Sequence, residues 1–369
     1  MTDGASDPTD IQIKFQCLQQ FVPEARKNLD DGAWDYIIGG AETETTQKRN
    51  RLALDKLAFR PRVMRDVSGL SAGCTFLNRE LRLPVVMAPI GSLQQFYAEG
   101  GAGVSKAVGE FGAAHMLSSV CQPGLEKVAE AAPDAARIFQ LYVRGDEAWI
   151  DDHIDRAIDH GYMAFCFTID LDYYGRRERD KAKGFLSVAR QTQSQGEEYQ
   201  RTFNWDSFKR VRDKYDIPLI LKGIATAEDA EIAVKEGCDV IYVSNHGGRQ
   251  LDHGRGGIDV LPEVVAAVDG RARVIFDGGV MRGSDIVKAM ILGADAVGIG
   301  RLQGLAYAAA GIEGVVRMLE LLENEVETVL GLLGVTSYDQ LEASHIYREA
   351  EAVKPPHPLS AFPLLDEGY

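Results

Sequence analysis

Residues 240–252 read VIYVSNHGGRQLD, an apolar run followed at once by polar and glycine residues. The run Val240–Val243 has the composition of a buried strand, and the loop after it carries Ser244, His246 and Arg249. Strand residues that are two apart face the same way, so we expect Ser244 and His246 on one side. The glycine pair lets the backbone approach a bound group closely. The stretch therefore predicts a strand that delivers reactive side chains to a site.

Seven further apolar runs resemble this one and alternate with segments long enough for crossover helices. The eight predicted strands lie within Leu83–Ile90, Ala113–Ser119, Arg137–Val143, Met163–Asp170, Pro218–Gly223, Asp239–Asn245, Arg273–Gly279 and Ala296–Arg301. Near-continuous apolar strands are typical of a parallel sheet that is covered on both faces. The alternation predicts an α/β fold, a TIM (β/α)8 barrel, with its active site at the carboxyl ends of the strands.

We expect the chain to form a single domain over residues 1–369. Its predicted parts are a helical N-terminal segment (1–60, with a helix near Pro23–Ile38), the barrel (61–345) and an extended tail (346–369). The polar stretch Gly175–Asp206 is far longer than a usual connection, which predicts a lid loop after the fourth strand.

Composition excludes several classes of function. The chain has 40 basic and 55 acidic residues and a net charge of −15, which disfavours binding to nucleic acid. Its five cysteines have no CxxC spacing, which suits a reducing compartment. The acidic N-terminus MTDGASDPTD is no targeting signal, and no apolar run approaches the roughly 18 residues of a membrane span. We therefore expect a cytoplasmic protein with no membrane partner.

Polar residues gather at the predicted carboxyl ends of four consecutive strands. They are Gln140, Tyr142, Thr168, Asp170, Lys222, Ser244 and His246. Burying polar groups at the end of an apolar strand is costly unless they are paired or bind something, so the set predicts a site. Asp170 can hold His246 in one tautomer and stabilise its charged form, which indicates an acid–base pair. No HxH, HExxH or CxxC spacing is present, so we expect no metal.

Glycine-rich turns follow the last two strands, at DGGVMRG (277–283) and GIGR (298–301). This is the usual phosphate-binding place in a TIM barrel, and Arg301 adds a forked positive charge. A phosphate-bearing ligand beside a general base leaves redox chemistry and isomerase or lyase chemistry both open.

The motif SNHGGRQLD closely resembles the signature of the FMN-dependent α-hydroxy acid oxidases and dehydrogenases, the group of glycolate oxidase, lactate oxidase and mandelate dehydrogenase. The similarity extends in order through WDYIIGGAE, RPRVMRDV, LSS, FQLYV, TIDLDYYGRRERD, LKG, DGGVMRG and GIGR. It implies a TIM barrel with FMN at the strand ends and a homotetramer. It also implies oxidation of an L-2-hydroxy acid to the 2-oxo acid, with the α-hydrogen passing to flavin N5 and O2 or another acceptor reoxidising the flavin.

The resemblance also implies roles for individual residues. The catalytic group is His246 as base, with Asp170, Tyr142 and Tyr36. Arg177 and Arg249 would bind the substrate carboxylate, and the two tyrosines would hydrogen-bond the substrate. The cofactor-binding group is Pro89, Ile90, Gly91, Ser118, Gln140, Thr168, Lys222, Ser244, Asp277, Gly278, Gly279, Gly300 and Arg301. Within that group Lys222 would stabilise the reduced flavin, Ser244 would contact its ring, and Gly279, Gly300 and Arg301 would hold the phosphate.

Departures from the family pattern lead to further expectations. Met281 stands where the family commonly has arginine after DGGV, which leaves Arg301 to neutralise more of the phosphate and predicts weaker FMN binding. Val120 stands where short-chain oxidases often have tryptophan after LSS. Four aromatic residues are candidates for the pocket wall: Phe96, Tyr97, Tyr173 and Tyr174. Together these differences predict a substrate larger than glycolate. The alternative is a non-redox TIM-barrel isomerase or lyase that binds a phosphorylated ligand.

Overall fold

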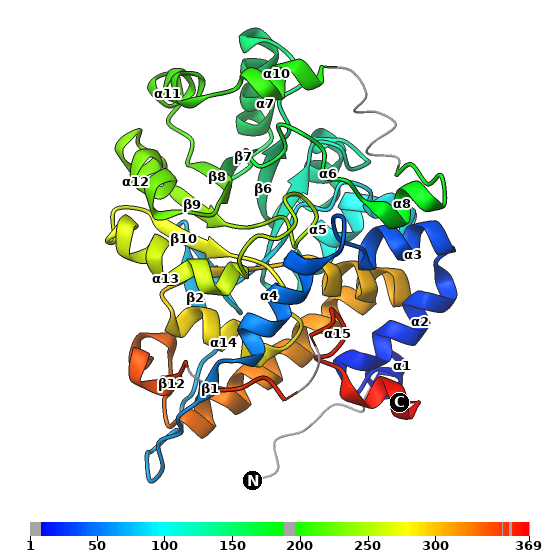
Figure 1. Cartoon of the computed structure of the whole chain (residues 1–369), viewed down its shortest axis with the longest axis vertical. Helices are drawn as coiled ribbons and strands as arrows, with labels where there is room; N and C mark the ends of the chain where they lie inside the picture. The colour runs from blue at the N-terminus through cyan, green and yellow to red at the C-terminus, as the bar shows by residue number, and fades with distance from the viewer. Residues whose placement is uncertain (1–8, 188–195, 349, 354–355, 369) are drawn as a thin grey trace.

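A closed barrel of eight parallel strands forms the centre of this computed structural model (Figure 1). The strands are β4 (Val85–Met87), β5 (Ala114–Ser118), β6 (Ala136–Leu141), β7 (Ala164–Thr168), β8 (Leu219–Ile224), β9 (Val240–Val243), β10 (Arg273–Phe276) and β11 (Ala296–Ile299). Each pairs with its neighbour along the chain, and β11 pairs with β4 to close the ring. The predicted TIM barrel is confirmed, with one strand in each predicted run. The structure describes residues 9–187, 196–348, 350–353 and 356–368.

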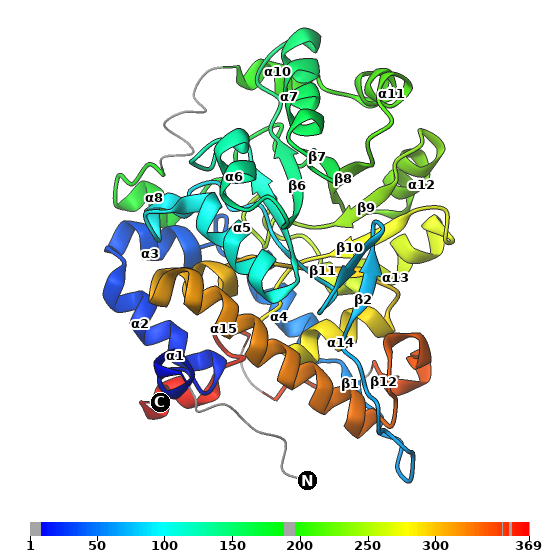
Figure 2. The same ribbon diagram turned by 180° about the vertical axis from the view of Figure 1, so that it is seen from behind.

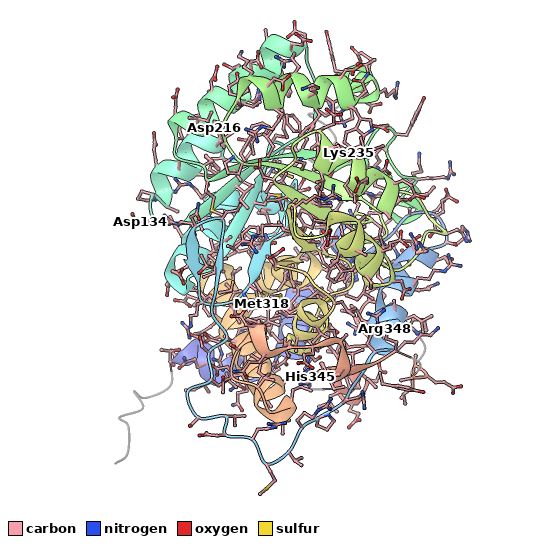
Figure 3. The ribbon with its side chains drawn as sticks, turned by 90° about the vertical axis from the view of Figure 1, so that its left-hand side faces the viewer. Asp134, Asp216, Lys235, Met318, His345 and Arg348 are labelled. Carbon is pink, nitrogen blue, oxygen red and sulfur yellow. The ribbon has the colours of Figure 1, made fainter. Side chains whose placement is uncertain are left out.

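Alternation along the strands separates two apolar cores. One residue of each pair points into the barrel and the next points toward the helices. The inner core contains Val86, Met116, Ile138, Cys166, Ile220, Tyr242 and Ile275. A hairpin of β2 (Cys74–Phe76) and β3 (Arg79–Leu81) adds Phe76 and Leu81 to this core (Figure 2). Asp134, Asp216 and Lys235 each lie shortly before a strand, so the side shown in Figure 3 includes the starting ends of β6, β8 and β9.

Helices surround the barrel and form the second core against its outer face. They are α5 (Gly100–Phe111), α6 (Leu125–Ala131), α7 (Glu147–Asp159), α11 (Trp205–Lys214), α12 (Ala227–Lys235), α13 (Gly257–Val268), α14 (Gly283–Ile291) and α15 (Arg301–Leu333). Local sequence sets their ends: Asp146 accepts a hydrogen bond from the Trp149 N–H to start α7, and Gly112, at φ +95°, ends α5. The long α15 is broken at Ala310 and Gly311.

The N-terminal segment is helical but contains a break that the sequence reading missed. Its elements are α1 (Asp10–Lys14), the 3-10 turn η1 (Leu18–Gln20), α2 (Phe21–Asn28), α3 (Asp31–Ile38), α4 (Thr45–Asp55) and β1 (Ala58–Phe59). The expected single helix at Pro23–Ile38 is two helices, because Asp30 leaves helical geometry and its carboxylate caps α3 through the Ala33 N–H at 2.7 Å. In Figure 1 α2 and α3 lie beside α15.

Three segments outside the barrel contain only short elements: the expected lid region, the turn after β4 and the C-terminal part. The expected lid region contains α8 (Glu178–Ala182) and α10 (Glu197–Thr202), and its part at 188–195 lies outside the described residues. A further turn, η2 (Leu93–Gln95), follows β4. The C-terminal part holds η3 (Tyr338–Gln340), η4 (Ala343–His345), β12 (Ile346–Tyr347) and η5 (Pro363–Glu367). The tail thus differs from an extended chain, since β12 pairs with β1 and η5 forms a compact turn.

Candidate active site

A cavity opens at the carboxyl ends of the barrel strands, where the fold places an active site. Fourteen of the predicted site residues line it: Tyr36, Pro89, Ile90, Gly91, Tyr142, Arg177, Lys222, His246, Arg249, Asp277, Gly278, Gly279, Gly300 and Arg301. The other predicted residues, Ser118, Gln140, Thr168, Asp170 and Ser244, lie at or just after the ends of neighbouring strands. The residues predicted from the strand ends therefore lie together at one face of the barrel.

His246 and Asp170 form a hydrogen-bonded pair. His246 Nδ1 lies 3.0 Å from Asp170 Oδ1, and both side chains are largely buried. Burial lowers the pKa of His246 below its ordinary 6.5, although the charge of Asp170 acts in the opposite direction. Burial tends to raise the pKa of Asp170, but the attraction of a protonated His246 and of Lys222 outweighs it, so the pKa is lowered. The resting pair is thus a neutral imidazole held by a carboxylate, the arrangement of a general base.

The backbone conformation at His246 and Gly223 positions the His246–Asp170 pair. His246 has φ +56°, in the left-handed region that non-glycine residues seldom occupy. Gly223, directly after Lys222, has φ +120°, and a Cβ there would lie 2.8 Å from Asp170 Cβ. A glycine at this bulge in β8 therefore lets Asp170 sit against the neighbouring strand.

Three arginines surround the cavity, and none forms an ion pair within the described residues. Arg249 donates to the main-chain oxygens of Tyr36 and Gly39 at 2.6 and 2.9 Å. Arg177 lies 4.2 Å from the ring of Tyr174. Burial, and then the charge of Arg177, lowers the pKa of Arg249. Like charges held together with no carboxylate in ion-pair contact make a site for anions.

Arg301 occupies the glycine-rich corner after β11. It donates to Gly247 O at 2.9 Å and to Gly39 O at 2.8 Å. Burial and the charge of Arg249 lower its pKa to about 9, and an anion beside it would stabilise the charged form. A Cβ on Gly300 would meet no atom within 4 Å, which leaves room for a bulky group here. Met281 lines the same cavity, whereas Arg282 is paired with Glu325 at 2.7 Å.

Several buried polar atoms at the strand ends are orphaned. Both amide atoms of Gln140 and the hydroxyl of Thr168 have no hydrogen-bond partner among the described residues. Buried polar groups are normally paired, so these positions fit a ligand that carries its own donors and acceptors. The carbonyl and N–H edge of a flavin ring has that character. With Arg301 and Gly300 for a phosphate, the residues present fit FMN.

Two of the four aromatic residues expected in the pocket wall line the cavity. Phe96 and Tyr174 line the cavity, together with Val120 and Leu171. Tyr97 does not, because its ring packs 5.3 Å from that of Tyr307. Tyr173 also points elsewhere: it is 74% exposed and lies under Arg201.

Two buried residues of α4 hold the loops of the site, and sequence reasoning missed both. Asn50 donates to Asn245 Oδ1 at 2.9 Å and accepts from the Gly257 N–H at 2.9 Å. Arg51 binds both carboxylate oxygens of Asp285, at 2.7 and 2.8 Å, and donates to Gly279 O at 2.9 Å. The segment TTQKRNR looks like a solvated helix, so its only signal is a spacing of three to four residues between buried positions.

A metal-binding cluster and a membrane-spanning helix are both lacking in the ranges that the structure describes. No group of three or more His, Cys, Asp or Glu side chains could hold a metal ion there. No described helix has the length and apolar character needed to cross a membrane.

Comparison with known proteins gives a consistent assignment. A family model described as FMN-dependent dehydrogenase matches residues 25–348. The chain is 38% identical to 4-hydroxymandelate oxidase of Amycolatopsis orientalis, over 88% of this chain and 96% of that protein. It is 34% identical to L-lactate oxidase of a Nostoc species, over 89% of this chain and 97% of that one.

Solved structures agree with this. A crystal structure of mandelate oxidase with benzoyl-formic acid superimposes with a TM-score of 0.85 at 36% identity. The match covers 92% of this chain and 100% of that chain. The fold and the sequence therefore indicate the same group of proteins.

Proposed function

Because this chain belongs to the FMN-dependent dehydrogenase family, we propose that its strand-end site oxidises an L-2-hydroxy acid to the 2-oxo acid. The enzyme uses FMN and acts on 2-hydroxy acids, as its oxidase relatives do. The observation that carries the residue assignment is the neutral His246, held by Asp170, in a cavity shared with three arginines that form no ion pair with the described residues. The isomerase or lyase alternative is not favoured, since relatives of this chain are named L-lactate oxidase and 4-hydroxymandelate oxidase.

His246 acts as the base that takes the proton of the substrate hydroxyl. Its Nδ1 is occupied by Asp170, so Nε2 is the nitrogen that can receive this proton. Asp170 then stabilises the imidazolium that forms, since its lowered pKa keeps it ionised. Lys222, whose charge also acts on Asp170, lines the same cavity.

Arg177 and Arg249 bind the substrate carboxylate, because a guanidinium pair matches a carboxylate in charge and geometry. Tyr36 and Tyr142 orient the substrate as hydrogen-bond donors. Burial raises the pKa of both phenols, so each keeps its proton at neutral pH. The ring of Tyr36 lies 4.8 Å from the guanidinium of Arg249, which fixes the two relative to each other.

FMN, when bound, would supply N5 as the acceptor of the α-hydrogen of the substrate. Gln140 and Thr168 would hydrogen-bond its ring, and Ser118, Pro89, Ile90 and Gly91 would pack beside it. Gly279, Gly300 and Arg301 would hold its phosphate, and Asp277 and Gly278 would line the rest of the cofactor site. Lys222 would stabilise the negative charge of the reduced form.

We propose a substrate with a side chain larger than that of glycolate, either aromatic or branched. Val120, Phe96, Leu171 and Tyr174 give the cavity an apolar wall. A relative named 4-hydroxymandelate oxidase and structural neighbours named mandelate oxidase support a substrate side chain of this size. We further propose O2 as the electron acceptor, and a single-domain homotetramer in the cytoplasm.

The experiment is anaerobic bleaching of the bound flavin by glycolate, lactate, 2-hydroxyisovalerate and mandelate, followed by admission of air. We expect the larger acids to bleach the flavin faster at equal concentration, and the colour to return quickly in air. Glycolate bleaching as fast as the others contradicts the proposed size. A slow return of colour in air contradicts O2 as the acceptor, and a purified protein without flavin absorbance would support a non-redox function.

A further inference from the structure

Three hydrogen bonds meet at the hydroxyl of Ser244. It accepts from Lys222 Nζ at 2.9 Å and from the His246 N–H at 3.0 Å, and it donates to Asp277 Oδ1 at 2.7 Å. A serine hydroxyl has one hydrogen to donate and two lone pairs to accept with. All three are used within the protein, so this oxygen has no bonding capacity left for a flavin ring.

The cluster ties together the carboxyl ends of three adjacent strands. Lys222 lies on β8, Ser244 directly follows β9, and Asp277 directly follows β10. All three side chains are buried. The Ser244 hydroxyl therefore sets the place of the Lys222 ammonium and of the His246 backbone at the same time, and it supports His246 in its unusual positive φ.

Asp277 brings a negative charge to this cluster. Its charge acts on Arg301, and burial and then the charge of Asp277 raise the pKa of Tyr242. The Ser244 hydroxyl joins its carboxylate to the Lys222 ammonium. Lys222 in turn lies 5.4 Å from the Tyr242 ring. In a buried setting an opposite charge one hydroxyl away offsets much of the effect of a cation on its surroundings.

We propose that Ser244 and Asp277 are positioning residues. Ser244 fixes Lys222 and His246 relative to each other, and Asp277 offsets the charge of Lys222 and thereby holds down the reduction potential of the bound flavin. This inference rests on the proposed function, in which Lys222 faces the flavin.

The decisive measurement is the two-electron midpoint potential of bound FMN in Asp277→Asn. We expect a more positive potential than in the wild type, because a less compensated Lys222 favours the reduced anion. A tenfold change in the reduction equilibrium corresponds to about 30 mV for a two-electron couple. The matched control is Asp269→Asn, the same change at an exposed, left-handed residue that ends α13. A potential equal to that of the control, or more negative, overturns the role of Asp277.

Ser244 is tested by Ser244→Ala beside the conservative Ser244→Thr, which keeps a hydroxyl. We expect the alanine variant, which loses all three hydrogen bonds, to be bleached by substrate about tenfold more slowly or worse, and threonine to restore most of the rate. An alanine variant as fast as the wild type overturns the positioning role, as does a threonine variant as slow as alanine. This arm also decides the proposal if Asp277→Asn does not retain FMN.

The potential is measured by titration with dithionite and a reference dye, with no 2-hydroxy acid present. A wild type that binds FMN but is bleached by no 2-hydroxy acid therefore refutes the proposed function alone. A wild type that is bleached, with potentials indifferent to Asp277, refutes the present inference alone.

Discussion

His246 Nδ1 lies 3.0 Å from Asp170 Oδ1, between residues that are 76 positions apart in the chain. The contact joins the loop after β9 to the loop after β7 across the end of β8, and it leaves only the Nε2 side of the imidazole for the cavity. Since the carboxylate is ionised and the imidazole is neutral, the pair is set to accept one proton. Much of the chemistry we propose depends on this one hydrogen bond.

Replacing Asp170 by asparagine should lower kcat/KM by roughly 10²-fold or more, within the range for general acid–base catalysis. The pH profile gives a second readout. Activity requires neutral His246, whose pKa lies below 6.5, so wild-type kcat/KM rises with pH through that pKa and is level above it. Asp170 acts to raise the pKa of His246, so Asp170→Asn should move the acid limb to lower pH. An acid limb that moves to higher pH in Asp170→Asn contradicts this account.

Gly223 tests how closely Asp170 must approach β8. A Cβ at this position would lie 2.8 Å from Asp170 Cβ, so Gly223→Ala should displace the carboxylate and lower kcat/KM about tenfold or more while FMN stays bound. Gly270→Ala is the control, because Gly270 also has a positive φ but a Cβ there meets nothing within 4 Å. Both variants should lose roughly 1–2 kcal/mol of stability to backbone strain. Equal kcat/KM in the two variants would show that the contact with Asp170 is unimportant.

Met281 tests the phosphate end of the cavity. Burial and the charge of Arg249 lower the pKa of Arg301, and Arg282 is engaged by Glu325, so one more cation at position 281 should bind the phosphate. We expect Met281→Arg to tighten FMN binding several-fold, as one added charge-assisted contact would. Met281→Leu is the neutral control. Fluorescence titration of the FMN-free protein gives both dissociation constants, and unchanged or weaker binding in the arginine variant argues against a phosphate at this corner.

Strand composition explains why the barrel could be predicted. Each strand is buried on both faces, so it is a continuous apolar run, and polar residues at its carboxyl end stand out. Asp170 and His246 were found in this way, because the parallel fold carries strand ends to one face whatever their separation in sequence.

Loops and long-range polar contacts could not be predicted in the same way. Tyr173 and Tyr174 are neighbours outside any strand, so no periodicity indicates which one enters the cavity. Asn50 lies in a helix of ordinary polar composition, and its partners Asn245 and Gly257 follow about 200 residues later. Asp30 broke a predicted helix because its capping hydrogen bond outweighs an apolar pattern that continues through it.

Gln200 is another residue that sequence reasoning missed, and it bridges two strand ends. Its amide oxygen accepts from the Val143 N–H at 2.9 Å, and its amide nitrogen donates to Thr168 O at 3.1 Å. It is fully buried, so Gln200→Leu leaves both main-chain groups unpaired at a cost of about 1–3 kcal/mol each. The ends of β6 and β7 carry Tyr142 and Asp170, so we also expect kcat/KM to fall several-fold.

Tyr199→Leu on the same helix is the control for Gln200, because Tyr199 is 39% exposed. Urea unfolding and steady-state kinetics of the two variants separate the outcomes. If Gln200→Leu matches Tyr199→Leu in both, the bridge does not position the strand ends.

His115 predicts how stability depends on pH away from the active site. It is fully buried beside Ser105 Oγ, 2.8 Å from its Nδ1, and burial lowers its pKa to about 3 from an ordinary 6.5. Above pH 6.5 the histidine is neutral in both folded and unfolded states, so its full contribution to stability is present. Below pH 6.5 His115 binds a proton in the unfolded chain but not in the folded protein. Stability is therefore lost at about 1.4 kcal/mol per pH unit until the pH approaches 3.

His115→Asn removes this proton while keeping an acceptor for Ser105. Between pH 7 and pH 5 the wild type should lose about 2 kcal/mol more of its free energy of unfolding than the variant does. Any fixed cost of the substitution is equal at both pH values and cancels in this difference. His253→Asn is the control, since the His253 side chain is 63% exposed. Urea unfolding at the two pH values gives the comparison, and parallel losses in wild type and His115→Asn would mean that His115 takes up its proton in the folded state.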